Sequence, residues 1–260
     1  MVLTQISRIV FACTFLMTGA LASADSPPPL HLVTMDYPPY IVTQNGTVQG
    51  PVVSVVREAF RRIGRPVVIE MLPWSRSLAM VSNGSADGLF TIKRTADREF
   101  TLLYPKEPVL TQEYVLFVRR GSPLRFTGDL GALADLRLGV TANNSYGPQF
   151  DDALTQNRFK HVQTAYDHEH LFRMLVAGRI DVAICSKPVG LAFVRTLNAE
   201  ELIQTIDPPV MTAFSYLVFT RQRDYAELVR NFEQTLIAMR RDGTLAKLLG
   251  DTPQISSSAH

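Results

Sequence analysis

The stretch Thr91-Ile-Lys-Arg-Thr-Ala-Asp-Arg-Glu-Phe100 places a basic turn between an apolar run and the start of a helix. Gly88–Phe90 is typical of the end of a strand, and Thr95 is a good helix N-cap. A helix N-terminus offers free N–H groups and the positive end of a dipole, and the turn adds cations. These cations are Lys93, Arg94 and Arg98. The stretch therefore predicts either a site for a small anion, such as a carboxylate, or a solvated basic turn.

The N-terminus has the composition of a cleavable signal peptide. The apolar run Ile9–Leu21 is too short to span a bilayer comfortably, and Ala22-Ser-Ala24 after it is a small-x-small cleavage site. Cys13 lies inside the apolar run and not after it, which argues against a lipoprotein anchor. We therefore expect residues 1–24 to be removed and the mature protein to reside in the periplasm.

Composition excludes several classes of function. The net charge is only +2, and no block of like charges indicates a nucleic acid or a membrane surface as partner. Removal of residues 1–24 leaves Cys185 as the one cysteine, in an apolar run that predicts a buried, inert thiol. His168 and His170 are two residues apart, which does not place them on one helix face. We expect no metal, no cofactor and no catalytic residue.

Two series of alternating strands and helices predict an α/β fold with parallel sheets. In the first series we expect strands at 30–35, 67–72 and 87–92 and helices at 51–63 and 73–82. A strand at 113–119 precedes the second series, in which we expect strands at 136–140, 162–164 and 182–185 and helices at 146–155, 168–177 and 188–197. A strand at 215–220 and helices at 225–242 and 244–249 complete the chain, and Asn143–Ser145 is a candidate N-cap cluster.

Two proline-bearing connectors, at Tyr104–Pro108 and Pro208-Pro209, join the two series. The simplest packing is two lobes with a ligand cleft between them, at the carboxyl ends of the strands. Residues 25–111 and 212–255 would form the first lobe, residues 112–211 the second, and residues 256–260 a loose tail. Hinges would lie at about 106–112 and 208–214.

An ordered set of motifs resembles the family 3 extracellular solute-binding proteins, the periplasmic components of polar amino acid ABC transporters. The set comprises Asp36-Tyr-Pro-Pro-Tyr40, Asn45-Gly46, Trp74, Thr95-Ala-Asp-Arg98, Gly178–Ala183 and Asp242-Gly-Thr244. The resemblance implies a two-lobed periplasmic-binding-protein fold of type II, a small carboxylate ligand and an inner-membrane ABC permease as partner. It also implies a binding protein rather than an enzyme, and we expect a monomer.

The resemblance also assigns roles to individual residues. It implies that Arg98 grips the ligand α-carboxylate through a bidentate pair, for which guanidinium is well shaped. Tyr37 and Trp74 would be aromatic walls, and the loop Ala142–Tyr146 of the second lobe, with Asn144 and Ser145, would also meet the carboxylate. The family carboxylate that binds the α-amino group of the ligand falls on Ser186.

Two departures from the family pattern alter the expected charge of the ligand. Ser186 supplies no anion for an ammonium group, and Lys93 stands where amino-acid binders often have a small hydroxyl residue. Burying the ammonium group of a ligand without an anionic partner costs several kcal/mol of free energy. We therefore expect a ligand with more negative charge than a zwitterion: an organic acid, or an acidic or N-modified amino acid.

Two other functions stay open on sequence grounds. Some relatives of this fold are periplasmic dehydratases of the cyclohexadienyl dehydratase type, which need a general acid or base in the cleft. The loop Ser186-Lys-Pro188 supplies no carboxylate or histidine, and Lys187 would serve only with a lowered pKa. The third possibility is a ligand-sensing module that acts on a membrane receptor in trans.

Overall fold

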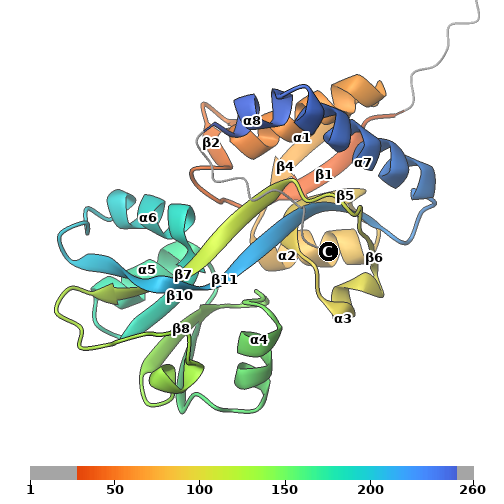
Figure 1. Cartoon of the computed structure of the whole chain (residues 1–260). Coiled ribbons are helices and arrows are strands. Elements are labelled where there is room, and N and C mark those ends of the chain that lie inside the picture. Colours follow the sequence, from red (N-terminus) through yellow and green to blue (C-terminus); the bar gives the residue numbers. More distant parts are fainter. Residues whose placement is uncertain (1–27, 251–260) are drawn as a thin grey trace, which may run out of the picture.

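The computed structural model describes residues 28–250, and the predicted signal peptide therefore lies outside the described residues. Figure 1 shows two groups of helices and strands, joined by two long strands that run from one group to the other. These strands are β7 (Leu110–Arg119) and β11 (Ile203–Thr220), which pair with each other in antiparallel fashion. We call the group that holds the N-terminal elements the first lobe and the other the second lobe.

A mixed sheet runs through both lobes in the order β4-β1-β5-β11-β7-β10-β8-β9. The outer strands are β1 (Leu30–Thr34), β4 (Val67–Met71), β5 (Gly88–Lys93), β8 (Arg137–Thr141), β9 (His161–Ala165) and β10 (Val182–Ser186). Within each lobe these strands pair in parallel, as predicted. The crossing strands, for which no direction was predicted, pair antiparallel to their neighbours. Crossing strands that return from one lobe to the other must run against the outer ones.

The helices follow the predicted order. They are α1 (Pro51–Ile63), α2 (Trp74–Ser82), α3 (Ala96–Glu99), α4 (Pro148–Thr155), α5 (His168–Val176), α6 (Lys187–Thr196), α7 (Ala226–Arg241) and α8 (Thr244–Leu249). Helix α1 begins at a proline, which needs no backbone donor there, and ends at Gly64 in the left-handed conformation. Small elements complete the fold: β2 (Val42–Gln44), β3 (Thr47–Gln49), β6 (Leu102–Leu103) and a 3₁₀ turn at Leu130–Leu133.

The expected connector at Pro208-Pro209 is instead part of β11, and this prediction was wrong. Strand β11 pairs with β7 on both sides of the prolines, and the register shifts between Ile206 and Met211. A proline has no N–H to donate to a sheet, and the shifted register accommodates this without ending the strand.

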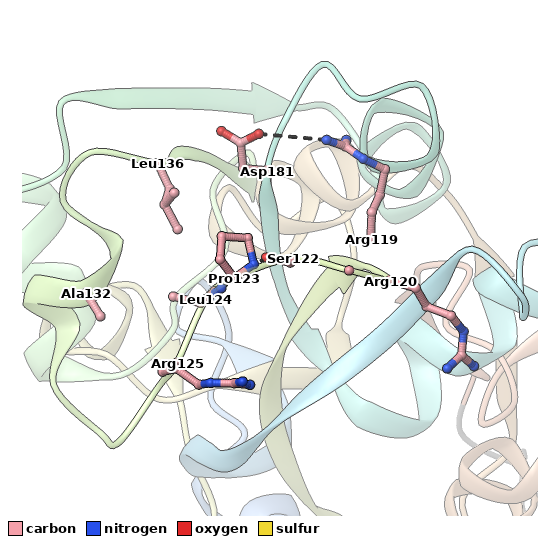
Figure 2. Close-up of a pocket in the computed structure, with 10 residues that line it drawn as sticks. Arg119, Arg120, Ser122, Pro123, Leu124, Arg125, Ala132, Leu136 and Asp181 are labelled. Atoms are coloured by element: carbon pink, nitrogen blue, oxygen red, sulfur yellow. Dashed lines mark hydrogen bonds and ion pairs between the residues drawn. The ribbon is translucent and has the colours of Figure 1, made fainter.

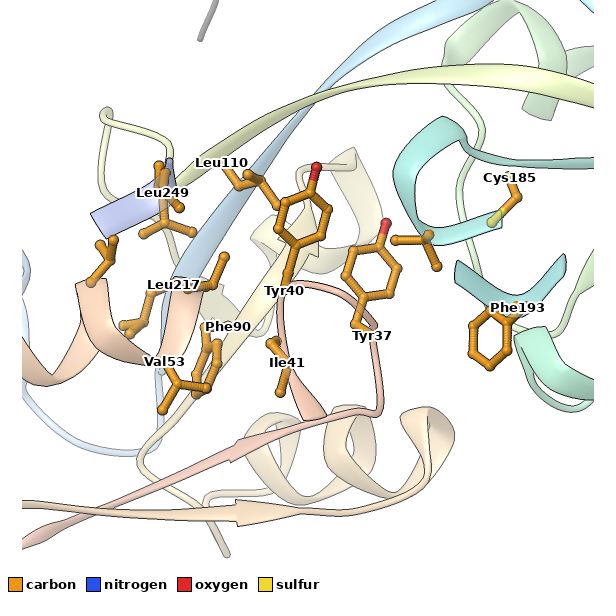
Figure 3. Close-up of a cluster of buried hydrophobic side chains, with 14 of the residues drawn as sticks. Tyr37, Tyr40, Ile41, Val53, Phe90, Leu110, Cys185, Phe193, Leu217 and Leu249 are labelled. Atoms are coloured by element: carbon orange, nitrogen blue, oxygen red, sulfur yellow. The ribbon is translucent and has the colours of Figure 1, made fainter. Parts of the chain in front are cut away.

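An apolar core joins the two lobes beneath the crossing strands. Figure 3 shows Tyr37 and Tyr40 packed in it, with Cys185 and Phe193 contributed by the second lobe. Cys185 is fully buried, and burial raises the pKa of its thiol to about 12. The thiol is therefore protonated and unreactive at neutral pH, as the sequence predicted.

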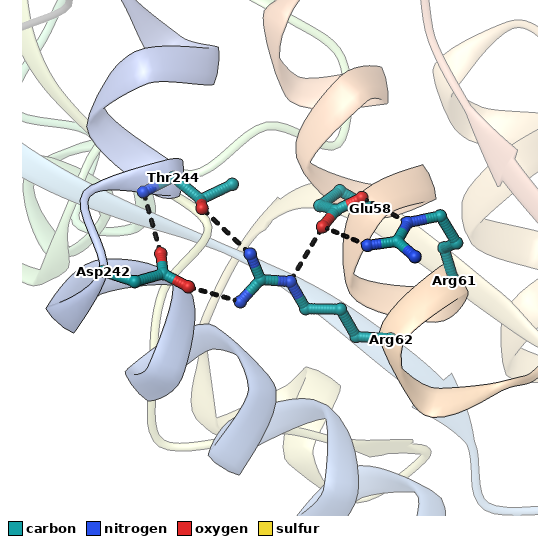
Figure 4. A network of polar contacts seen from close by, with 5 residues as sticks. All are labelled: Glu58, Arg61, Arg62, Asp242 and Thr244. Carbon is teal, nitrogen blue, oxygen red and sulfur yellow. Dashed lines mark hydrogen bonds and ion pairs between the residues drawn. The ribbon is translucent and has the colours of Figure 1, made fainter.

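A polar network on the surface of the first lobe fixes α1 against the C-terminal helices (Figure 4). Glu58 accepts hydrogen bonds from both Arg61 and Arg62. Arg62 also donates to Asp242 at 2.7 Å and to Thr244 at 2.9 Å. The network orients α1 against α7 and α8, which cover one side of the first lobe. Among residues 28–250, no helix is both long and apolar enough to cross a membrane.

Candidate functional site

The basic turn after β5 faces the second lobe. Thr95 caps α3 as predicted, because its side chain accepts a hydrogen bond from the Arg98 backbone N–H. The guanidinium of Arg98 donates to the Lys93 carbonyl at 2.9 Å and to the Asn143 carbonyl at 2.7 Å. Asn143 belongs to the loop after β8 in the second lobe, so Arg98 bridges the two lobes.

Trp74, at the start of α2, shares this bridge. Its indole N–H donates to the same Asn143 carbonyl at 3.0 Å, and the Arg98 guanidinium lies 5.4 Å from the centre of its ring. The Asn143 side chain in turn donates to Ser75 at 2.9 Å. Asn143 has a left-handed backbone (φ 56), which asparagine tolerates better than most residues. This one loop residue therefore holds the lobes together through three contacts with the first lobe.

Lys93 is buried at the end of β5, with 8% of its surface exposed. Its ammonium group donates to the Tyr114 hydroxyl at 2.7 Å and to Asn144 Oδ1 at 2.8 Å, and it lies 4.3 Å above the Tyr114 ring. Burial, followed by the nearby charge of Arg98, lowers the pKa of Lys93 to about 7. Among the described residues, no carboxylate forms an ion pair with either Lys93 or Arg98.

Tyr37 and Ser186 lie behind Lys93 in a buried hydrogen-bonded chain. The Tyr37 hydroxyl contacts that of Tyr114 at 3.0 Å and donates to Gln112 at 3.1 Å. Gln112 donates to Ser186 Oγ at 3.0 Å, and Ser186 is fully buried. Burial raises the pKa of Tyr37 above its usual range. The structure thus places Tyr37 and Ser186 inside the protein, where their hydroxyl groups are already satisfied.

The loop before α4 is held by the carboxylate of Asp151 together with its own polar side chains, since Asn144 Oδ1 and Ser145 Oγ accept from the Ser145 and Gly147 N–H groups. Ser145 Oγ donates to Asp151 at 2.5 Å, and the Tyr146 N–H donates to the same carboxylate at 2.7 Å. Helix α4 begins after Gly147, which makes no side-chain cap. The expected N-cap cluster at Asn143–Ser145 was therefore wrong. The helix starts at Pro148, too late for those side chains to reach its free N–H groups.

A cavity of about 360 Å³ lies between the lobes, and we call it the inter-lobe cavity. The first lobe contributes Met35, Asp36, Met71, Leu72, Pro73 and Trp74, and the second contributes Thr141, Tyr166, Asp167 and His168. Of the predicted site residues, only Trp74 lines this cavity, and Arg98 contacts its ring. The edge of the Tyr37 ring packs on His168, 5.5 Å between centroids, so Tyr37 supports the wall from behind.

Two residues that line this cavity each carry a buried polar atom with no hydrogen-bond partner among the described residues. The atoms are Thr141 Oγ1 and His168 Nε2. Burial, together with the charge of Lys93, lowers the pKa of His168 to about 4, which keeps its ring neutral at physiological pH. The sequence did not indicate either residue as part of a binding site. Thr141 ends a strand and His168 begins a helix, and only tertiary packing buries their polar atoms.

Two carboxylates line the same cavity. Asp36 follows β1, and Asp167 is the N-cap of α5, where it accepts a hydrogen bond from His170 N–H at 2.7 Å. Burial raises the pKa of Asp36, and the charges of Glu169 and Asp167 raise it further. The sequence offers one hint of this carboxylate, because Asp36 opens the Asp-Tyr-Pro-Pro-Tyr motif.

Other cavities in the described residues have different linings. One of about 400 Å³ is lined by Lys93 and Ser145, with Met211 and Tyr216 from β11. Another, of about 660 Å³, lies in the second lobe beside the end of β7, between Arg119 and Arg125 (Figure 2). None of the predicted site residues lines the latter.

Asp181, which borders the cavity in Figure 2, has a structural role. Its carboxylate accepts two side-chain hydrogen bonds from Arg137, at 3.0 and 2.5 Å, and one from the Arg137 N–H at 3.0 Å. Within the part of the chain that the structure describes, no group of acidic, histidine or cysteine side chains could hold a metal ion.

Comparisons with known proteins agree with this architecture. A histidine kinase sensor domain with similarity to periplasmic binding proteins has a TM-score of 0.76 at 21% identity, over 86% of this chain and 95% of its own. An ancestral arginine-binding protein bound to arginine gives 0.74 at 17% identity, over 86% and 97%. The arginine-, lysine-, histidine-binding protein ArtJ from Geobacillus stearothermophilus gives 0.73 at 18% identity, over 87% and 97%.

At these identities the solved structures establish the fold, which is that of the periplasmic binding proteins. A search among curated protein sequences finds no match. The sequence profile of one family, however, matches residues 31–250, nearly the whole described chain. The chain therefore belongs to the bacterial extracellular solute-binding proteins, family 3.

Proposed function

We propose that this chain is the periplasmic solute-binding protein of an ABC importer and captures a small carboxylate-bearing solute between its lobes. Arg98 would bind the carboxylate, with Lys93 as a second cation nearby. Trp74 would form one wall of the ligand site, His168 the opposite wall, and Tyr37 would support His168. The loop with Asn144 and Ser145 would close over the carboxylate. Ser186, already bonded to Gln112, would keep its neighbours in place.

One observation carries this proposal: two cations lie close together at the lobe boundary, and no carboxylate within residues 28–250 forms an ion pair with either. Lys93 and Arg98 contact neutral oxygens and aromatic rings only, and neither forms an ion pair within residues 28–250. Burying an unpaired charge costs several kcal/mol, roughly, so a fold that keeps two of them gains from a partner supplied by a ligand. A carboxylate matches the donors of guanidinium and ammonium.

The crossing strands suggest how the lobes would move. We propose the division stated above, with the first lobe at 25–111 and 212–255 and the second at 112–211. Its boundaries fall on β7 and β11, which the two lobes share. Rotation about these strands would open the inter-lobe cavity once the bonds to Asn143 break.

Calorimetry on the mature protein, unfolded and refolded to remove bound solute, tests the binding site. The panel holds zwitterionic amino acids and amine-free carboxylates. We expect at least one carboxylate to bind, and Arg98→Met to weaken it about a hundredfold, since two charge-assisted bonds disappear. Arg230→Met, at an exposed position on α7, is the matched control and should bind normally. Equal binding by both variants would contradict the proposal.

Uptake of labelled solute by cells that lack or carry the chain tests the transport role. Transport that depends on Arg98 supports an importer component, whereas binding without transport would favour the sensing alternative.

The dehydratase alternative predicts turnover of prephenate-like cyclic acids by the purified protein, and we expect none. A periplasmic location is checked by fractionation and by the mass of the mature N-terminus, expected at Asp25.

A further inference from the structure

We propose that Thr141 and His168 form a hydrogen-bonding subsite for the end of the ligand remote from its carboxylate. The group bound there would be a hydrogen-bond donor, such as a hydroxyl, an amide or an amine, and not a second carboxylate. This inference rests on the proposed function, because it assigns the inter-lobe cavity to the same solute.

Both polar atoms are built into rigid surroundings. Thr141 is the last residue of β8 and 4% exposed, and His168 is the first residue of α5 and 6% exposed. The imidazole stacks on Phe193, with the planes 10° apart, and packs edge-on against Tyr37. The ring therefore cannot turn freely to find another partner for Nε2 within the protein.

An unpartnered buried polar atom is a net cost to the folded protein. Thr141 Oγ1 and His168 Nε2 are the two such side-chain atoms among the described residues, and both belong to residues that line the inter-lobe cavity. Valine and phenylalanine would fill the same space without that cost. A ligand group that satisfies both atoms when the cavity is occupied accounts for their presence, as sites for binding are often kept at the expense of stability.

The charges around the cavity decide the kind of group. Asp36 and Asp167 line it and form no ion pair with a described cation, so they repel a second carboxylate and attract a donor. His168, neutral at physiological pH, can accept at Nε2, and the Thr141 hydroxyl accepts as well. The single carboxylate of the ligand would bind on the cationic side of the site, at Lys93 and Arg98.

This assignment narrows the ligands that the sequence suggested. An acidic amino acid or a dicarboxylic acid would carry a second anion toward Asp36 and Asp167. A monocarboxylate with a donor at its far end would place each charge against its complement. The ligand would then be an organic acid or N-modified amino acid whose one carboxylate lies at the Arg98 end.

The test uses acids that differ only at the far end: valerate, 5-hydroxyvalerate, 5-aminovalerate and glutarate, and the same series with an α-amino group. Calorimetry on the wild type should show a donor-bearing acid binding about tenfold or more tighter than its unsubstituted parent, the value of one hydrogen bond. Glutarate and glutamate should be the weakest of their series. Thr141→Val and His168→Phe should each reduce the preference for a donor to threefold or less.

Thermal unfolding of the ligand-free variants separates a subsite from a structural role. Thr141→Val and His168→Phe should melt at the wild-type temperature or above it, because each removes an unpartnered atom. Thr220→Val is the matched control: its hydroxyl accepts a bond from the Gln222 N–H, so it should melt lower and keep the ligand preference.

Several results would overturn the inference. These are a preference for the dicarboxylates, an unchanged preference in both variants, or a lower melting temperature in both. If the acids bind and Arg98→Met abolishes that binding, only the subsite has failed. If neither series binds to the wild type, the subsite is wrong, and the wider carboxylate panel then decides the proposed function separately.

Discussion

The ammonium group of Lys93 has only neutral oxygens and an aromatic ring for partners. The Tyr114 hydroxyl and Asn144 Oδ1 accept its hydrogen bonds, and burial lowers its pKa to about 7. A bound carboxylate would reverse this shift, because an anion at short range favours the charged form. Ligand binding should therefore be coupled to the protonation of this one lysine.

The coupling predicts a pH dependence with a definite sign. Above pH 7 the ligand-free protein loses the Lys93 proton, so the affinity for an amine-free carboxylate should fall by up to about tenfold per pH unit between 7 and 8.5. Calorimetry at pH 6, 7 and 8.5 measures this, and Lys93→Met should bind more weakly with a flat profile. A steep profile that persists in Lys93→Met would contradict it.

Stability without ligand should change in the opposite direction. The unfolded chain keeps its Lys93 proton up to about pH 10.4, whereas the folded chain releases it near pH 7. The unfolded state thus binds more protons in this window, so this residue makes the folded state gain stability as the pH rises from 7 to 10. Denaturant unfolding of wild type and Lys93→Met gives the contribution as the difference between their pH profiles.

For single residues, the sequence could predict only the site residues that belong to a recognisable local pattern. A basic turn before a helix marked Lys93 and Arg98, and the structure places both at the lobe boundary. Thr141 and His168 gave no such signal, because their lack of partners arises from contacts with residues distant in the chain. Tyr37 was expected as an aromatic wall of the ligand site, and the sequence did not indicate that its ring is buried with its hydroxyl bonded to Gln112 on β7.

At the scale of elements, periodicity predicted nearly every outer strand and helix. The proline at the start of α1 and the glycine after its end are local sequence features, so the bounds of this helix could be predicted. The full length of strand β11 could not be predicted from the sequence, because β11 continues to pair with β7 on both sides of the prolines at 208 and 209. The sequence did not indicate the direction of the crossing strands, because this direction depends on the path of the chain between the lobes.

The packing of α6 on β7 gives a prediction at this scale. Gly190 lies in α6, where an added methyl group would overlap the rings of Phe117 and Phe172. These rings pack edge to face, 5.0 Å between centroids, and are fully buried, so neither can move aside. Gly190→Ala should therefore lower the free energy of unfolding by about 1–3 kcal/mol.

Denaturant unfolding measures this change, and its sign is diagnostic. In an unobstructed helix the same substitution stabilises by about 1 kcal/mol, so a gain would show that the contact is loose. The double variant Gly190→Ala with Phe117→Leu should recover part of the loss, because it removes the overlapping atoms of one ring.

In the whole molecule, one loop residue makes three of the polar contacts between the lobes. The Asn143 carbonyl accepts bonds from Trp74 and Arg98, and its side chain donates to Ser75 at 2.9 Å. Asn143→Gly keeps the left-handed backbone and removes only the Ser75 bond. We expect ligand affinity to fall about three- to tenfold, because the closed arrangement loses one hydrogen bond.

Asn198 provides the matched control. It is an exposed residue of the second lobe with the same left-handed backbone (φ 50), and Asn198→Gly should leave affinity unchanged. Calorimetry on both variants checks the prediction. Equal losses would mean that added chain flexibility, and not the bond between the lobes, is responsible.

In the proposed function, the negative charge of a carboxylate holds the solute at Arg98. We would test this contact by calorimetric titration of the wild type and Arg98→Met. The ligands are the tightest-binding acid of the panel and its methyl ester. We predict that the acid binds the wild type about a hundredfold more tightly than the ester, and that Arg98→Met reduces the acid to the level of the ester. An ester that binds the wild type as tightly as the acid would contradict the account.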